Sequence, residues 1–142
     1  MMGRRPSALS AGFTLVELVI AVAILAILIG VAIPSYTTWV TNSNRAEGKA
    51  LLMTTAQALE RCFTRFSAYN SANCQVSFPL DSENGWYRIS APEGGELTAT
   101  TFLLTAQPQN AQATRDTRCA NLTLNHRGVR GISGTGTVGD CW

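Results

Sequence analysis

One carboxylate stands inside the apolar N-terminal run of this 142-residue chain, and the residues just before that run are small. The carboxylate is Glu17, and the small residues are Ser10, Ala11 and Gly12. An ordinary secretory signal is cleaved after its apolar region, whereas a cut at Gly12 would leave the apolar segment on the mature chain. A carboxylate in a membrane segment is costly, so it usually has a partner and a function.

The sequence Ala-Gly-Phe-Thr-Leu-Val-Glu-Leu at 11–18, with apolar residues continuing to Pro34, resembles the class III signal peptide of type IV pilins and pseudopilins. This resemblance implies that a prepilin peptidase cuts between Gly12 and Phe13 and then methylates the new amino terminus. It also implies that Glu17 pairs with the Phe13 amine of a neighbouring subunit during assembly. A second interpretation is that Glu17 satisfies its own helix end, where a negative charge suits the helix dipole.

The charges before the apolar run predict the topology of the precursor. Removing Arg4 and Arg5 from the 11 basic residues leaves nine, against nine acidic residues, so the mature chain is formally neutral. The positive-inside bias would keep these two arginines in the cytoplasm. We therefore expect a single-pass inner-membrane precursor with a periplasmic head, which joins a pilus at the cell surface after assembly. The partners implied by the resemblance are other pilin subunits, the peptidase, and the assembly platform in the inner membrane.

Hydrophobic patterning predicts one long helix over about 13–66. Its first part, 13–33, has about 21 residues and would span roughly 30 Å, the thickness of a bilayer core. Beyond Pro34 the pattern becomes amphipathic, because Leu51, Thr55 and Leu59 recur at helical spacing while Arg45 and other charges provide polar faces. The length suits one small domain and an anchor. We expect a leader at 1–12, a transmembrane and assembly helix at 13–34, and a head at 35–142.

The second half of the chain is typical of short strands and turns. Leu122 and Leu124 should point inward, and the turn signal at 125–128 follows them. An α+β fold follows, in which a roughly four-stranded antiparallel sheet packs on the amphipathic half of the helix. The expected strands are Val76–Leu80, Trp86–Ser90, Leu97–Ala106 and Cys119–Asn125.

All four cysteines lie beyond the apolar run, on the side where disulfides persist. Three pairings are possible. We favour Cys62 with Cys74 and Cys119 with Cys141, because each pair is adjacent in sequence. The second bridge would fasten a glycine-rich C-terminal region that has little side-chain surface to bury. A zinc site is a weaker interpretation, since the spacings are wide and no CxxC occurs.

Four arginines concentrate near the C-terminus, and Asp116 is the one acid among them. These arginines are Arg115, Arg118, Arg127 and Arg130. Such a patch could contact the phosphates of DNA. Arginines in this arrangement also form ion pairs between subunits, or a solvated face.

No catalytic arrangement is visible in the sequence. The only histidine, His126, falls in a predicted turn, and the chain contains no GxxxxGK[ST], HExxH or GxSxG motif. We therefore expect a structural subunit with no enzymatic activity, no cofactor and no metal. A minor pilin that primes or joins a type IV pilus, with a role in motility or adhesion, is the first hypothesis. The alternatives are a pseudopilin of a type II secretion system and a DNA-binding pilin for DNA uptake.

Overall fold

The computed structural model describes residues 12–142, and the leader arginines Arg4 and Arg5 lie outside the described residues. The chain divides into two compact units, of which the first runs to Thr37 and the second, the head, covers Thr38–Trp142. Helix α1, Leu15–Phe66, belongs to both units and continues through Pro34. The prediction of one long helix is confirmed.

Local side chains define the two ends of α1. At its start, the backbone N–H of Glu17 donates to the hydroxyl oxygen of Thr14 at 3.2 Å, so Thr14 caps the helix. At its end, Ser67 adopts φ 55° and its N–H donates to the Phe63 carbonyl at 2.7 Å. A left-handed residue directly after the last turn is a common way for a helix to end. Arg65 lies in that last turn, where a positive charge suits the helix dipole.

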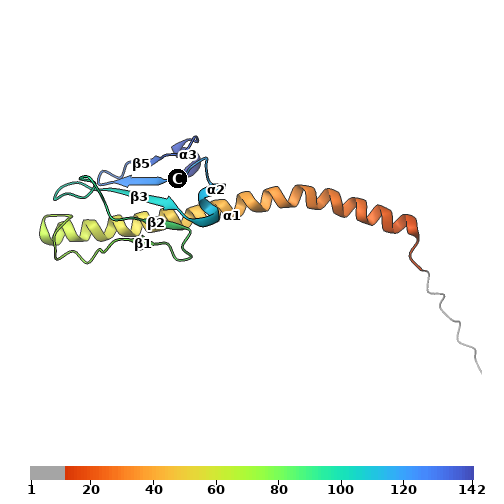
Figure 1. Ribbon diagram of the computed structural model, residues 1–142, viewed down its shortest axis with the longest axis horizontal. Helices are drawn as coiled ribbons and strands as arrows, with labels where there is room; N and C mark the ends of the chain where they lie inside the picture. The colour runs from red at the N-terminus through yellow and green to blue at the C-terminus, as the bar shows by residue number, and fades with distance from the viewer. Residues whose placement is uncertain (1–11) are drawn as a thin grey trace, which may run out of the picture. The chain divides into compact units, whose positions relative to one another are not determined.

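The head contains one antiparallel sheet in which each strand pairs with its neighbour in sequence, in the order β1-β2-β3-β4-β5. The strands are Leu80–Asp81 (β1), Tyr87–Ile89 (β2), Leu103–Pro108 (β3), Leu122–Asn125 (β4) and Arg130–Ile132 (β5). Within the head, the sheet lies alongside the second half of α1 (Figure 1). The predicted α+β class is confirmed, with one strand more than expected.

Several expected strands are shorter in the structure than in the sequence prediction. Strand β1 begins only at Leu80, and Leu97 forms just an isolated bridge with Phe102 before β3. Two short helices were not anticipated: α2, Asn110–Arg115, and α3, Val138–Cys141. Each has only a few residues, which is too short for a helical repeat of apolar residues to show.

Strand β5 forms within the glycine-rich region that sequence patterning left without an element. Its Gly131 pairs with Thr123 of β4, and a Cβ added at Gly131 would lie 2.5 Å from the Thr123 hydroxyl oxygen. The expected turn at 125–128 connects the two strands, with Gly128 at φ 74°. Glycine is therefore needed here for close approach and for a left-handed turn position, and not as a sign of an unstructured chain.

The core of the head lies between α1 and one face of the sheet. Leu52 and Leu59 supply the helix side, whereas Leu51, which shares the predicted helical spacing with Thr55 and Leu59, is only partly buried. In β4 the predicted alternation is confirmed, because Leu122 and Leu124 are buried and the residues beside them are not. The other core side chains from the strands are Tyr87, Ile89, Leu104 and Ala106.

Two disulfides close the head, and each joins cysteines that are adjacent in sequence order. Cys62 at the end of α1 is bonded to Cys74, and Cys119 before β4 is bonded to Cys141 in α3. No free cysteine remains among the described residues, so none of the four thiols is available to a zinc ion. The second bridge holds α3 at the beginning of β4 and so fastens the glycine-rich region.

Gly48 is the point of closest approach between α1 and the sheet. A Cβ added there would lie 2.7 Å from Cγ of the buried Tyr87 ring. Helix propensity alone favours alanine over glycine by about 1 kcal/mol, but overpacking costs about 1–3 kcal/mol.

We therefore expect Gly48→Ala to destabilise the head, as measured by urea unfolding of the full chain in detergent micelles. Gly139→Ala is the matched control, because nothing lies within 4 Å of a Cβ at Gly139. A Gly48→Ala variant that is as stable as the control would show that the Tyr87 contact does not constrain α1.

Candidate functional site

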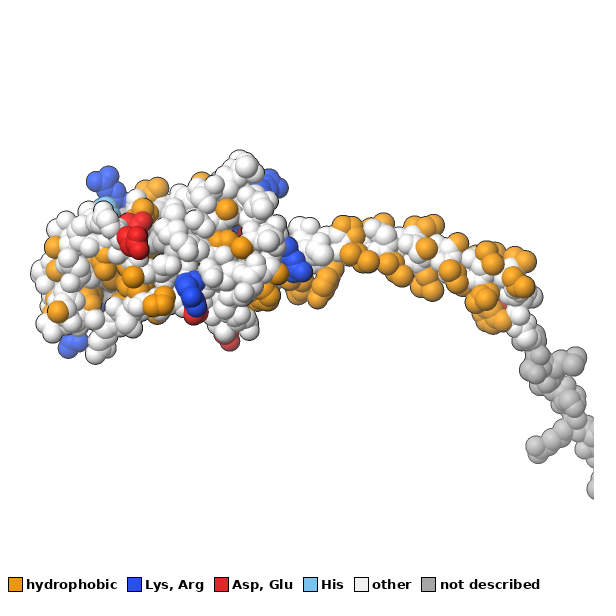
Figure 2. Space-filling view, viewed as in Figure 1, with side chains coloured by type: hydrophobic (Ala, Val, Ile, Leu, Met, Phe, Trp, Pro, Cys, Tyr) orange, Lys and Arg blue, Asp and Glu red, His pale blue; other side chains and the backbone are white. Residues whose placement is uncertain are grey.

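The first half of α1 is an apolar helix with no cover. Every large apolar side chain from Phe13 to Ile33 is exposed, by between 52% at Ile24 and 79% at Leu15. Orange side chains line the visible face of this half (Figure 2). By length and composition α1 can cross a membrane. Leaving so many side chains in water is unfavourable by tens of kcal/mol, at roughly 1.5–3 kcal/mol each, so lipid or protein must cover them.

Glu17 projects from the first turn of this uncovered half. Its backbone N–H is bonded to Thr14, but no hydrogen bond or ion pair involves its carboxylate among residues 12–142. The helix start is thus capped by the Thr14 hydroxyl, and the Glu17 carboxylate makes no contact with it. This geometry is compatible with a favourable interaction between Glu17 and the dipole of its own helix, which needs no hydrogen bond. It leaves a carboxylate that can take a partner from another molecule.

The four C-terminal arginines lie on both sides of β4 in the chain, because Arg115 and Arg118 come before it and Arg127 and Arg130 follow it. Arg118 forms an exposed ion pair with Asp140 at 2.6 Å. On the face shown in Figure 2, blue side chains stand at separate points.

Arg130 and Asp116 make contacts in the structure that the sequence did not predict. The Arg130 guanidinium lies 5.1 Å from the ring centroid of Trp142, in a cation–π contact. Asp116, which the sequence placed among the arginines as their opposing charge, is 1% exposed and faces the interior. Asp140 is therefore the carboxylate that lies beside this group, where it forms an exposed ion pair with Arg118.

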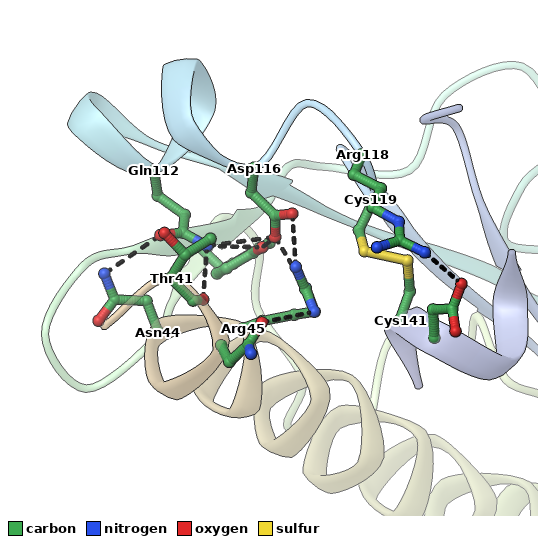
Figure 3. Close-up of polar contacts among 11 residues, drawn as sticks. Thr41, Asn44, Arg45, Gln112, Asp116, Arg118, Cys119 and Cys141 are labelled. Atoms are coloured by element: carbon green, nitrogen blue, oxygen red, sulfur yellow. Dashed lines mark hydrogen bonds and ion pairs between the residues drawn. A yellow bond between two sulfur atoms is a disulfide. The ribbon is translucent and has the colours of Figure 1, made fainter. Parts of the chain in front are cut away.

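A buried polar network around Asp116 was missed by the sequence prediction, which placed Arg45 on an exposed face. The Arg45 guanidinium donates to both carboxylate oxygens of Asp116, with Nε to Oδ2 at 2.9 Å and Nη2 to Oδ1 at 2.7 Å (Figure 3). Tyr87 Oη donates to the same Oδ2 at 2.9 Å. The hydrogen bond to Asp116 raises the pKa of Arg45, and burial raises the pKa of Tyr87. Arg45 therefore stays charged and Tyr87 stays protonated.

The network extends through amide side chains to the backbone of α1. Gln112, fully buried on α2, donates through Nε2 to the Thr41 carbonyl at 3.0 Å, and Asn44 Nδ2 donates to Gln112 Oε1 at 3.2 Å (Figure 3). These bonds fasten α2 to α1 near the beginning of the head. The network contains no nucleophile and no histidine, so its role is to position elements. No spacing in the sequence links Arg45 to Asp116, which are 71 residues apart.

An uncovered apolar half-helix with one carboxylate, joined to a head closed by two disulfides, defines a type IV pilin. The chain belongs to the family described as "Type IV minor pilin ComP, DNA uptake sequence receptor", whose model matches residues 34–123. A second model, "Prokaryotic N-terminal methylation motif", matches residues 8–33. The resemblance seen in the sequence is confirmed, and the chain is a structural subunit and not an enzyme.

Similar proteins include a type IV major pilin, PilA, of Myxococcus xanthus, which is 34% identical over 84 residues. That match covers 58% of this chain but only 38% of the relative, so the chain spans well under half of that protein's length. A type IV pilin structure from Shewanella oneidensis has 29% identity and a TM-score of 0.47, covering 72% of this chain and 97% of that one. The non-core minor pilin PilV of Neisseria meningitidis has 20% identity and a TM-score of 0.49, covering 69% and 91%.

The buried ion pair allows a direct test of what fastens the head to α1. Removing one partner of a buried pair typically costs about 3–5 kcal/mol, because the other charge stays buried without compensation. We therefore expect Asp116→Asn to lower the free energy of unfolding by that amount. A double variant with Arg45→Met and Asp116→Leu should lose much less. Urea titration of the full chain in detergent micelles would measure both.

The exposed pair Arg118–Asp140 provides the control for this experiment. Asp140→Asn should cost less than about 1 kcal/mol, because solvent screens such pairs. Equal losses in Asp116→Asn and Asp140→Asn would contradict the assigned role of the network.

Proposed function

We propose that this chain is a minor pilin, made as a membrane-held precursor, cut between Gly12 and Phe13 by a prepilin peptidase, and methylated on Phe13. The uncovered apolar half of α1 carries this proposal, together with the methylation motif matched at 8–33. After the cut, this half stays on the mature chain and moves from lipid into a filament core made by other pilin subunits. The match to a minor-pilin family supports a subunit that primes or joins the filament.

In this proposal the head faces the periplasm before assembly. The arginines Arg4 and Arg5 precede the apolar segment and favour a cytoplasmic position for that end. The two disulfides of the head suit an oxidising compartment. The inner-membrane assembly platform then extracts the subunit into a pilus at the cell surface. The family match favours this pathway over a type II secretion pseudopilin.

In this proposal, Glu17 sets the position of each subunit relative to its neighbour in the filament. Its carboxylate has no partner among the described residues, and it lies four positions after Phe13, whose amine becomes charged on cleavage. In an apolar filament core, a carboxylate and an ammonium group from neighbouring subunits neutralise each other. A subunit inserted out of step would bury both charges unpaired, which is strongly unfavourable.

Processing at Gly12 can be tested by mass. The mature protein should begin with N-methylated Phe13, and Gly12→Gln should leave uncut precursor in the membrane, because a side chain there would obstruct close approach of the peptidase to the backbone. Intact-mass spectrometry of the protein from membranes and from sheared filaments measures both forms. Filament protein that still carries Arg4 and Arg5 would disprove the proposed cleavage.

The role of Glu17 is tested by separating insertion from assembly. Glu17→Ala removes a charge from the apolar segment, so insertion into the membrane should be at least as efficient as in the wild type. Incorporation into filaments should fall several-fold, because the Phe13 amine loses its counter-charge. Quantitative immunoblots of membrane and sheared-filament fractions measure both steps. Glu83→Ala, in an exposed loop of the head, is the control and should change neither.

Wild-type filament levels of normally cleaved Glu17→Ala subunits would exclude charge pairing in this protein. The carboxylate would then have to act in peptidase recognition, in methylation or at its own helix end.

DNA binding during uptake is a second candidate function. The specific observation in its favour is that the matched family is described as a receptor for the DNA uptake sequence. The sequence also supplied four C-terminal arginines for this role. DNA binding by the wild-type chain, measured as a salt-dependent change in the anisotropy of labelled duplex DNA, would support it.

A further inference from the structure

A groove with two arginines lies at the C-terminal end of α1. It has a volume of about 580 Å³ and runs between the last turns of α1 and the loop that the Cys62–Cys74 disulfide closes. Arg61 and Arg65 are one helical turn apart and both line it. The remaining lining residues are Ala58, Cys62, Phe66, Asn73, Cys74, Gln75 and Val76.

This groove has a positive charge that no carboxylate offsets. None of its lining residues is acidic, and in the part of the chain that the structure describes the three ion pairs engage Arg45, Arg88 and Arg118. Glu60, next to Arg61 in sequence, accepts a hydrogen bond from the Tyr69 hydroxyl at 2.9 Å and lines a neighbouring groove, which Arg61 and Arg130 also line. No carboxylate oxygen among the described residues therefore lies within 4.0 Å of a guanidinium nitrogen of Arg61 or Arg65, the distance at which an ion pair forms.

The neighbours of the two arginines suit contact with an anion. The Arg65 guanidinium lies 5.8 Å from the centroid of the Phe66 ring, which reduces the freedom of that side chain. Asn73 and Gln75 also line the groove, and amide side chains can donate to phosphate oxygens. The helix dipole explains one arginine in the last turn, Arg65, but not Arg61 one turn earlier.

We propose that this groove, and not the C-terminal arginine group, contacts the phosphate backbone of DNA. The proposal rests on the DNA-binding function proposed above, and it assigns the contact to Arg61 and Arg65. Guanidinium groups bind phosphate oxygens through paired hydrogen bonds. In the C-terminal group, Arg118 forms an ion pair with Asp140, whereas neither Arg61 nor Arg65 has a carboxylate partner among the described residues.

The test compares two matched double variants of the full chain in detergent micelles: Arg61→Gln with Arg65→Gln, and Arg115→Gln with Arg118→Gln. Binding to fluorescent duplex DNA is followed by anisotropy between about 50 and 200 mM NaCl. Each lost phosphate contact reduces the slope of log affinity against log salt by about 0.9. The groove variant should therefore lose about two from the magnitude of that slope, and at least about tenfold in affinity at the lower salt concentration. The C-terminal variant should keep the wild-type slope.

A third variant, Arg61→Lys with Arg65→Lys, keeps both positive charges and should keep most of the salt slope. If the groove variant binds DNA poorly because loss of the arginines disturbs folding, the lysine variant should bind poorly as well. Arg4 and Arg5 are common to all variants and cancel in the comparison. Wild-type DNA binding that the groove variant retains in full would overturn the groove assignment and leave DNA binding itself standing. A wild-type chain that fails to bind DNA at the lower salt concentration would overturn both proposals.

Discussion

The apolar half of α1 cannot remain in water, and this constraint governs the rest of the molecule. Its large side chains from Phe13 to Ile33 are all more than half exposed. The head covers only the second half of the same helix, where Leu52 and Leu59 are buried. One continuous helix thus serves two environments: a stable core in the head, and a segment that lipid or other subunits must cover. A pilin needs both, because it waits in a membrane before it assembles.

A helix that carries assembly contacts at one end must be held firmly at the other, and three features of the head do this. The Tyr87 ring packs on Gly48, where no larger residue fits. The buried pair Arg45–Asp116 joins α1 to the residues after α2. The Cys62–Cys74 disulfide ties the end of α1 to the loop that follows it. Each contact fixes α1 along its axis or about it, so the sheet has a defined position on the second half of the helix.

Much of this architecture could be predicted from the sequence, because its signals are local. The apolar run and the helical spacing of Thr55 and Leu59 gave the long helix, and the alternation of Leu122 and Leu124 gave β4. Adjacency gave the cysteine pairing. Strand β5 could not be predicted in this way, because a glycine-rich strand has no side-chain pattern and depends on its pairing with β4.

The candidate sites likewise could be predicted only where their residues are close together in the sequence. Gly12, Phe13 and Glu17 belong to one short motif, so the sequence was enough to single them out. Arg45 and Asp116 are distant in sequence, and charged residues are ordinarily assigned to the surface, so neither their burial nor their pairing could be read from it. The groove of Arg61 and Arg65 likewise depends on how the loop closed by Cys74 returns to α1.

The most direct test of the central claim is to quantify this chain by mass spectrometry in membranes and in filaments sheared from the cells that express it. If the apolar half of α1 is covered by other pilin subunits, the filaments will contain the chain as a minor component that begins at Phe13. If the chain is confined to the membrane fraction with its leader intact and none is found in filaments, the account is wrong, and the apolar half of α1 is only a membrane anchor.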